Sequence, residues 1–82
     1  MSCYLYVLRT DQKKRWYIGT AVIVSDRLAK HNKGLVRSTK AYRPWTLMYT
    51  EKHETQDKAR YREWTLKHSA YQRRKLYAEI LR

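Results

Sequence analysis

The segment at residues 3–8 (CYLYVL) is apolar on both of its faces, and this property limits the fold more than any other feature of the chain. The segment is rich in residues that favour strands. Because successive side chains of a strand point to opposite faces, the two faces carry Tyr4, Tyr6 and Leu8 on one side and Cys3, Leu5 and Val7 on the other. A strand of this kind must be covered on both sides, so we predict that it is the central strand of its sheet.

Two further strands are predicted, at residues 16–19 and 45–50. The polar residues 9–15 (RTDQKKR) fit a hairpin connection between the first two strands. The third strand follows a basic loop at residues 35–42, and Arg43-Pro44 favours an extended entry into it. Glu51 and Glu54 are assigned to the connection that follows the third strand.

Three helices are predicted from apolar spacing and from capping residues. The first spans residues 24–33 and ends before Gly34, although no capping side chain marks its start. The second spans residues 56–67 after Thr55, with Asp57 in its first turn. Ser69-x-x-Gln72 is a capping box that opens the third, whose predicted buried side consists of Leu76, Tyr77, Ile80 and Leu81. The resulting fold class is α/β (α+β): a small three-stranded, mainly antiparallel sheet flanked by helices, in the order β-β-α-β-α-α.

The length of 82 residues corresponds to one domain, residues 1–82. Cys3 is the only cysteine, so no disulfide forms within the chain, and a lone thiol suits the reducing cytoplasm. No apolar run approaches the roughly 20 residues that cross a bilayer, and no signal peptide is evident. We therefore expect a cytoplasmic protein that does not enter a membrane.

The net charge of +12 indicates a polyanionic partner. Nucleic acid is the first candidate. An anionic membrane surface is the second, but the basic residues are spread along the whole chain instead of forming one amphipathic anchor. The remaining alternative is a basic protein without such a partner.

The stretch at residues 17–32 (YIGTAVIVSDRLAKHN) has the composition of a phosphate site. Tyr17 stands near the end of a predicted strand, and Gly19 allows a backbone or a ligand to come close. Arg27 and His31 are four residues apart and therefore share one helix face. Without further information, such tyrosines are more often half-buried strand residues, and such a cation and imidazole more often form a solvated helix face.

Glu63 differs from the other acidic residues because it lies on a core-facing helical stripe, with Ala59, Arg62 and Leu66. A carboxylate on such a stripe needs a partner or a metal. An ion pair with Lys67 or Arg27 and a single-metal site are both open. His53 and His68 are interpreted as surface residues.

Several motifs together resemble the GIY-YIG endonuclease superfamily. They are Tyr4-Leu5-Tyr6, Tyr17-Ile18-Gly19, Arg27-Leu28-x-x-His31-Asn32 and Ala59-x-x-x-Glu63-x-x-Leu66-Lys67. The chain is similar in particular to small stand-alone bacterial members, which resemble the N-terminal nuclease module of excinuclease C. The stretch at residues 38–45 (STKAYRPW) is also like that of these small proteins, although Tyr4 replaces the glycine of the first motif.

The resemblance implies a nuclease that hydrolyses phosphodiester bonds with one divalent ion, Mg²⁺ or Mn²⁺. By position, the implied catalytic residues are Tyr6, Tyr17, Arg27, His31 and Glu63, with Glu63 as the metal ligand. Arg27 would bind a phosphate. A tyrosine would act as general base, favoured as a phenolate by the cationic site, with Tyr17 preferred over Tyr6 and His31 as a competing base or relay.

The expected substrate is DNA, bound mainly through its backbone, in repair or recombination. The expected phosphate contacts are the basic loop and a basic run of the third helix, namely Arg37, Lys40, Arg43, Arg73, Arg74 and Lys75. Since one domain leaves no second recognition domain, low sequence specificity or recruitment by a protein partner is expected. The rival hypothesis is a non-catalytic module that binds DNA or RNA. The oligomeric state stays open.

Overall fold

The computed structural model describes residues 2–10, 12 and 15–82. Its elements follow the predicted order β-β-α-β-α-α. They are β1 (Cys3–Thr10), β2 (Arg15–Ala21), α1 (Val24–Asn32), a 3₁₀ turn (Lys40–Tyr42), β3 (Thr46–His53), α2 (Gln56–His68) and α3 (Ala70–Ile80).

The strands form one antiparallel sheet in the order β2-β1-β3, so β1 is central, as predicted. Tyr6 of β1 lies opposite Gly19 of β2 and Thr50 of β3. The pairing of β1 with β3 shifts register between Val7 and Leu8, which interrupts the predicted regular alternation along β3.

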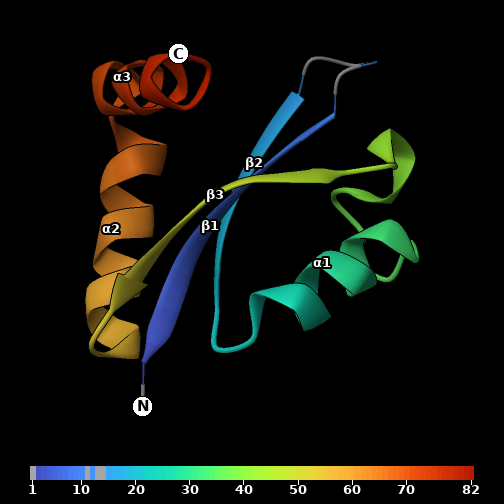
Figure 1. Cartoon of the computed structure of the whole chain (residues 1–82), viewed down its shortest axis with the longest axis horizontal. Coiled ribbons are helices and arrows are strands. Elements are labelled where there is room, and N and C mark those ends of the chain that lie inside the picture. Colours follow the sequence, from blue (N-terminus) through green and yellow to red (C-terminus); the bar gives the residue numbers. More distant parts are fainter. Residues whose placement is uncertain (1, 11, 13–14) are drawn as a thin grey trace.

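Helices cover both faces of the sheet. Figure 1 shows α1 on one side and α2 and α3 on the other, with the strands between them. On the α2 face Leu5 and Val7 pack in one core cluster with Ile18, Leu66 and Leu76. On the α1 face the second cluster contains Tyr6, Leu8, Ala21 and Trp45. The two apolar faces of β1 therefore belong to two separate cores.

The strands are longer than predicted. Arg9 and Thr10 were assigned to the hairpin connection, but they pair with Trp16 and Arg15 in the sheet. The predicted connection is thereby shortened to residues 11–14, of which 11, 13 and 14 lie outside the described residues. β2 also continues past Gly19 to Ala21. Hydrogen bonds between neighbouring strands stabilise the extended backbone even where the residues are polar. A local pattern of hydrophobic residues therefore does not show where such strands end.

β3 begins one residue later than predicted and ends three residues later. Glu51, which was expected in the connection after the strand, pairs with Leu5 in the sheet. Its carboxylate is hydrogen-bonded to neighbouring side chains, which allows a polar residue to occupy a strand position.

The predicted helix caps are largely confirmed. Ile23 at the start of α1 makes no side-chain cap, and Gly34 after its end has φ +78°, a conformation that favours glycine. The side chains of Thr55 and Ser69 accept hydrogen bonds from the backbone N–H groups of Lys58 and Gln72, each at 3.2 Å.

Two helix ends differ by one residue from the prediction, since α1 stops at Asn32 and α2 reaches His68. The third helix, for which only the start and the buried side were predicted, stops at Ile80. Leu81 was predicted to be buried and is 51% exposed, because it lies at the C-terminal cap of α3 beyond the packed turns.

Candidate active site

A hydrogen-bonded row of three buried side chains joins β1, α1 and the loop after α1. The Tyr6 hydroxyl lies 3.0 Å from Nε2 of His31, and Nδ1 of His31 lies 2.8 Å from Oγ1 of Thr39. Tyr6 and His31 have no exposed surface, and Thr39 is 2% exposed. The row is therefore a rigid support inside the protein.

The direction of the hydrogen bonds in this row follows from its surroundings. Burial, and secondarily the charge of Arg27, lowers the pKa of His31, so its imidazole is neutral at neutral pH. The Thr39 hydroxyl donates to the carbonyl oxygen of Val36 at 3.3 Å. We therefore assign the imidazole proton to Nδ1, which donates to Thr39, and Nε2 then accepts the proton of the Tyr6 hydroxyl.

Gly19 makes room for the Tyr6 hydroxyl. A Cβ atom at residue 19 would lie 2.6 Å from the Tyr6 hydroxyl oxygen, 2.8 Å from Cζ of Tyr6 and 3.0 Å from Cε2 of Tyr17. Any side chain here would displace at least one of the two phenols. The predicted close approach at Gly19 is thus made by side chains of this protein.

Tyr17 and Arg27 lie next to this row, beside Tyr6. The Tyr17 ring is 4.7 Å from the His31 ring and 6.2 Å from the Tyr6 ring, centroid to centroid. A side-chain interaction with Tyr6 raises the pKa of Arg27 against the effect of burial, and Tyr17 adds to this rise. The structure thus brings together four of the predicted site residues, and Tyr17 and Arg27 are only partly buried.

The expectation that a cationic site favours the phenolate is wrong for Tyr6. Burial raises the pKa of Tyr6 and outweighs the side-chain interaction with Arg27, which lowers it. Tyr6 therefore keeps its proton at neutral pH. The cause is the depth of the residue, which composition does not reveal.

Glu63 lies on the sheet-facing stripe of α2, as predicted, and its side chain is 23% exposed. Its carboxylate pairs with Nζ of Lys67 at 2.6 Å, so Lys67 is the partner that the sequence left open between Lys67 and Arg27. The same Nζ lies 5.6 Å from the centroid of the Tyr17 ring. Burial is the main reason why the pKa of Tyr6 is raised, and the negative charge of Glu63 adds to the rise. Glu63 therefore lies near enough to Tyr6 to influence its ionisation.

Two of the six predicted phosphate-contacting residues make backbone contacts in this structure. Nε of Arg43 donates to the carbonyl oxygen of Lys40 at 2.8 Å. Nη1 of Arg73 donates to the carbonyl oxygens of Leu66 and Lys67, at 3.0 and 2.9 Å, near the end of α2. The other four residues are exposed: Arg37, Lys40, Arg74 and Lys75. For all six, contact with phosphate stays a prediction.

Sequence reasoning missed Thr39, and it named Lys67 only as a possible partner of Glu63, not as a neighbour of Tyr17. Thr39 lies eight residues after His31 in an irregular loop, so periodicity offers no signal for it. The loop is held against α1 and the sheet by Trp45, whose Nε1 donates to the Thr39 carbonyl oxygen at 3.0 Å. The Asn32 side chain bonds both backbone polar groups of Trp45, at 2.6 and 3.0 Å.

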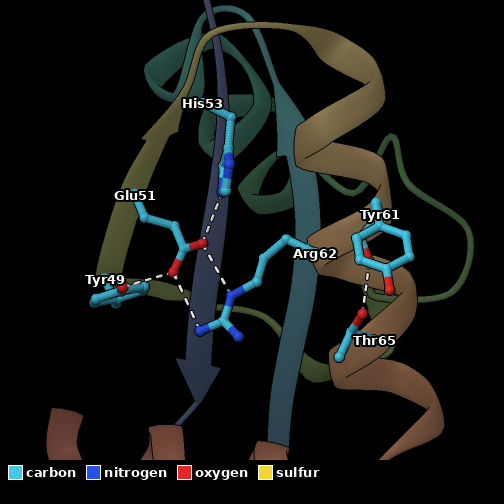
Figure 2. A network of polar contacts seen from close by, with 6 residues as sticks. All are labelled: Tyr49, Glu51, His53, Tyr61, Arg62 and Thr65. Carbon is cyan, nitrogen blue, oxygen red and sulfur yellow. Dashed lines mark hydrogen bonds and ion pairs between the residues drawn. The ribbon is translucent and has the colours of Figure 1, made fainter.

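A second polar cluster lies on the opposite face of the sheet and was not predicted (Figure 2). Glu51 accepts hydrogen bonds from Tyr49 at 2.6 Å and from Nε of Arg62 at 3.0 Å, and it pairs with His53 at 2.7 Å. Burial alone would raise the pKa of Glu51, but the hydrogen bonds from these partners together lower it. For Tyr49, burial and the neighbouring Glu51 both raise the pKa, to about 12.

This Glu51 cluster ties β3 to α2. Tyr49 and Glu51 pair with Val7 and Leu5, whose side chains face α2, so the cluster points away from Tyr6. His53, interpreted as a surface residue, is partly buried here because Glu51 binds it. We regard the cluster as structural.

The comparison with known proteins agrees with this arrangement. The family model of the GIY-YIG catalytic domain matches residues 2–76. The chain belongs to the GIY-YIG family. The membership confirms the resemblance inferred from the motifs.

Among solved structures, the chain is similar to the solution NMR structure of the UPF0213 protein BH0048 from Bacillus halodurans. The two share 28% sequence identity with a TM-score of 0.59, over 95% of this chain and 84% of the other. No curated protein matches this chain. The GIY-YIG family is a nuclease family, so a nucleic acid is the substrate that membership implies.

Within residues 2–10, 12 and 15–82, no helix is long and apolar enough to span a membrane.

Proposed function

We propose that this protein is a divalent-metal-dependent endonuclease that hydrolyses phosphodiester bonds of DNA. The observation that carries the proposal is the gathering of Tyr17 and Arg27 over the buried Tyr6–His31–Thr39 row, beside the Glu63–Lys67 pair. These side chains come from separate segments of a chain that belongs to a nuclease family.

Arg27 binds the scissile phosphate in this proposal. Its Nε is buried and has no hydrogen-bond partner among the residues that the structure describes. A guanidinium can donate two parallel hydrogen bonds to phosphate oxygens. The Tyr6 side chain lies close enough to raise the pKa of Arg27, and Tyr6 is itself held by His31, so we propose that it orients the guanidinium.

The burial of the two phenols separates their proposed roles. Tyr17 is partly exposed, so in this proposal its hydroxyl proton leaves to solvent and the phenolate oxygen then receives the proton of the attacking water. Tyr6 has no exposed surface, and it could take a proton only by passing its own to Nε2 of His31. Burial and Arg27 disfavour the resulting imidazolium. Tyr6 and His31 are therefore proposed to position Arg27 and Tyr17.

The donor set fits one magnesium or manganese ion with Glu63 as its protein ligand. Among the described residues there is no group of three or more His, Cys, Asp or Glu side chains that could hold a metal. Mg²⁺ is commonly bound by one or two carboxylates together with substrate phosphates and waters, and Glu63 can offer one oxygen while Lys67 binds the other. When bound, such an ion neutralises charge that develops on the leaving oxygen.

The proposal also includes how the DNA is bound, the biological role and the location. Binding mainly through the phosphate backbone, which the net charge of +12 supports, gives low intrinsic sequence specificity. Roles in repair or recombination and recruitment by a protein partner are part of the proposal. So is a cytoplasmic location, which the free thiol of Cys3 supports.

Glu63→Gln tests the proposal directly. This change removes a metal-binding carboxylate with little change in size, so magnesium-dependent cleavage of plasmid or branched DNA should fall by at least about 100-fold, while DNA binding measured without divalent ions should change by less than about 3-fold. The readout is nicking of supercoiled plasmid and cleavage of labelled branched and linear DNAs, each with magnesium or manganese.

Glu54→Gln is the matched control, because Glu54 forms the same kind of i, i+4 ion pair, with Lys58 at 3.4 Å. This variant should cleave at the rate of the unmodified protein. Unchanged cleavage by Glu63→Gln would contradict the assigned role of Glu63.

The second candidate function is a non-catalytic module that binds DNA or RNA. The observation that favours it is the 2.6 Å ion pair that already satisfies one oxygen of Glu63. For such a module, no magnesium-dependent nicking exists in the unmodified protein, whereas binding is retained in both variants. The same experiment therefore separates the two functions.

A further inference from the structure

Three planar rings form an exposed ladder on α2, on the side turned away from the sheet. Tyr61, Trp64 and His68 are spaced i, i+3 and i+7 and so form one stripe. The rings of Tyr61 and Trp64 are 6.4 Å apart and inclined by 17°, and those of Trp64 and His68 are 4.5 Å apart and inclined by 22°. Figure 2 shows Tyr61 on a different side of α2 from Arg62.

The ladder is exposed although its residues are large. Tyr61 is 70% and Trp64 56% exposed, and Nδ1 of His68 donates to the Trp64 carbonyl oxygen at 2.9 Å. This hydrogen bond holds the imidazole over the indole. Exposed aromatic rings that are grouped in this way mark a surface on which another planar group can stack.

Basic side chains border the ladder and connect it with the candidate active site. A surface hollow of about 310 Å³ is lined by Arg60, Glu63, Trp64, Lys67 and His68. One concavity therefore contains the indole of Trp64, two cations and Glu63, and Lys67 reaches from this hollow toward the Tyr17 ring.

We propose that the Tyr61–Trp64–His68 ladder stacks the unpaired bases of a single-stranded segment of nucleic acid while Arg60 and Lys67 contact its backbone. The inference rests on the proposed function and deepens it, because it assigns the substrate class: nucleic acid with an unpaired strand next to the scissile phosphate. Exposed aromatic rings bordered by cations are the combination that binds single strands without sequence preference. An apolar protein surface fits less well, because cations flank the rings.

The ladder discriminates against an intact duplex. Base faces in a duplex are covered by neighbouring base pairs, whereas unpaired bases can leave the stack and lie on protein rings. A fully paired substrate would use only the basic residues. We therefore expect flaps, bulges and splayed ends to be preferred over blunt duplexes.

The test compares two ligands that differ only in their bases: a 12-nucleotide oligo-dT and an abasic strand with the same number of phosphates. Binding of the full chain is measured by fluorescence anisotropy without divalent ions, so that no cleavage occurs. The unmodified protein should bind oligo-dT about 10-fold more tightly than the abasic strand, and Trp64→Ala should lose most of this preference. An oligo-U strand, measured in parallel, should show the same loss.

Two controls isolate stacking. Tyr71→Ala removes an aromatic side chain that is 67% exposed and lies on α3, outside the ladder, and it should keep the preference. Trp64→Phe keeps an aromatic ring and should retain most of it. Blunt duplex binding should change by less than about 2-fold in every variant, and circular dichroism should show unchanged unfolding.

Intrinsic fluorescence gives an independent readout, because Trp64 is 56% exposed, whereas Trp45 is only 4% exposed and Trp16 is half-buried and stacked on Tyr77. Oligo-dT should quench the emission of the unmodified protein, and Trp64→Phe should abolish most of this quenching. Equal affinity for oligo-dT and the abasic strand would overturn the proposal, as would equal losses of single-strand and duplex binding in Trp64→Ala.

The outcome is distinguishable from that of the proposed function. A preference for bases without magnesium-dependent cleavage would support the ladder in a binding module and contradict the nuclease. Cleavage that depends on Glu63, without any preference for bases, would support the nuclease and overturn the ladder.

Discussion

At the residue scale, the absence of a side chain at Gly19 determines where the Tyr6 and Tyr17 phenols lie. Gly19→Ala would place a Cβ 2.6 Å from the Tyr6 hydroxyl oxygen, which must then move and break its bond with His31. We expect a loss of about 1–3 kcal/mol of unfolding free energy and of about 100-fold in cleavage rate, measured by urea unfolding and plasmid nicking.

Thr20→Ala is the control for this prediction, because the side chain of the next strand residue points to the opposite face. It should affect cleavage by less than about 3-fold. Full activity in Gly19→Ala would show that the phenols need not occupy the positions seen here.

The buried imidazole of His31 makes stability depend on pH. Its pKa in the folded protein is lowered below 6.5, the ordinary value, so the unfolded chain binds more protons than the folded one between these two pKa values. Stability is therefore complete above pH 6.5 and is lost as the pH falls toward the folded pKa, by up to about 1.4 kcal/mol per pH unit. Urea unfolding between pH 7.5 and 5.5 measures this slope.

His31→Gln should be less stable at pH 7.5 and should lose the slope between pH 6.5 and 5.5. The lowered pKa of Glu51 does not interfere, because its contribution is present above pH 4.5 and is lost only below that value. An unchanged slope in His31→Gln would contradict the neutral, buried state assigned to His31.

At the element scale, α2 links the core to the site. Leu66 is fully buried in the core below it, whereas Glu63 and Lys67 extend toward the phenols. Hydrogen bonds of two side chains stabilise the junction between α2 and α3. Ser69 caps the start of α3, and Arg73 donates to carbonyl oxygens at the end of α2. These hydrogen bonds add to the packing of Leu66 and Leu76 in one core cluster, which also joins the two helices.

Arg73→Gln tests whether this arginine acts on the fold or on nucleic acid. Two hydrogen bonds to carbonyl oxygens at a helix end are lost, so we expect about 1–2 kcal/mol of destabilisation by urea unfolding. Arg74→Gln is the comparison, since Arg74 is exposed, and it should change stability by less than about 0.5 kcal/mol. Equal stability of the two variants would argue that the contacts of Arg73 are dispensable.

At the scale of the whole molecule, the net charge of +12 determines how the protein meets its partner. Affinity for DNA should fall linearly with salt on a logarithmic plot, because bound cations release counterions. Lys40→Ala, in the exposed basic loop, should weaken binding to all sequences alike and reduce the slope by about 1. Lys40→Arg keeps the charge and should keep the slope, and an unchanged slope in Lys40→Ala would exclude a phosphate contact there.

The sequence alone was sufficient where the determining physics is local. The two apolar faces of residues 3–8 predict a central strand, side chains at Thr55 and Ser69 predict helix starts, and Gly34 predicts a helix end, because each depends on nearest neighbours along the chain. The motifs also identified the family and the residues that the structure brings together. Strand ends were less predictable, because β2 and β3 each pair with β1 and these pairings continue into polar residues.

Only the tertiary structure decided which atoms meet and how they ionise. Thr39 supports His31 from an irregular loop, and Lys67 is the partner of Glu63, which spacing left open with Arg27. Burial keeps the Tyr6 proton in place despite the cationic surroundings. The physical reason is that desolvation and hydrogen bonding depend on depth and distance in three dimensions, and neither quantity is encoded by the order of residues within a short window.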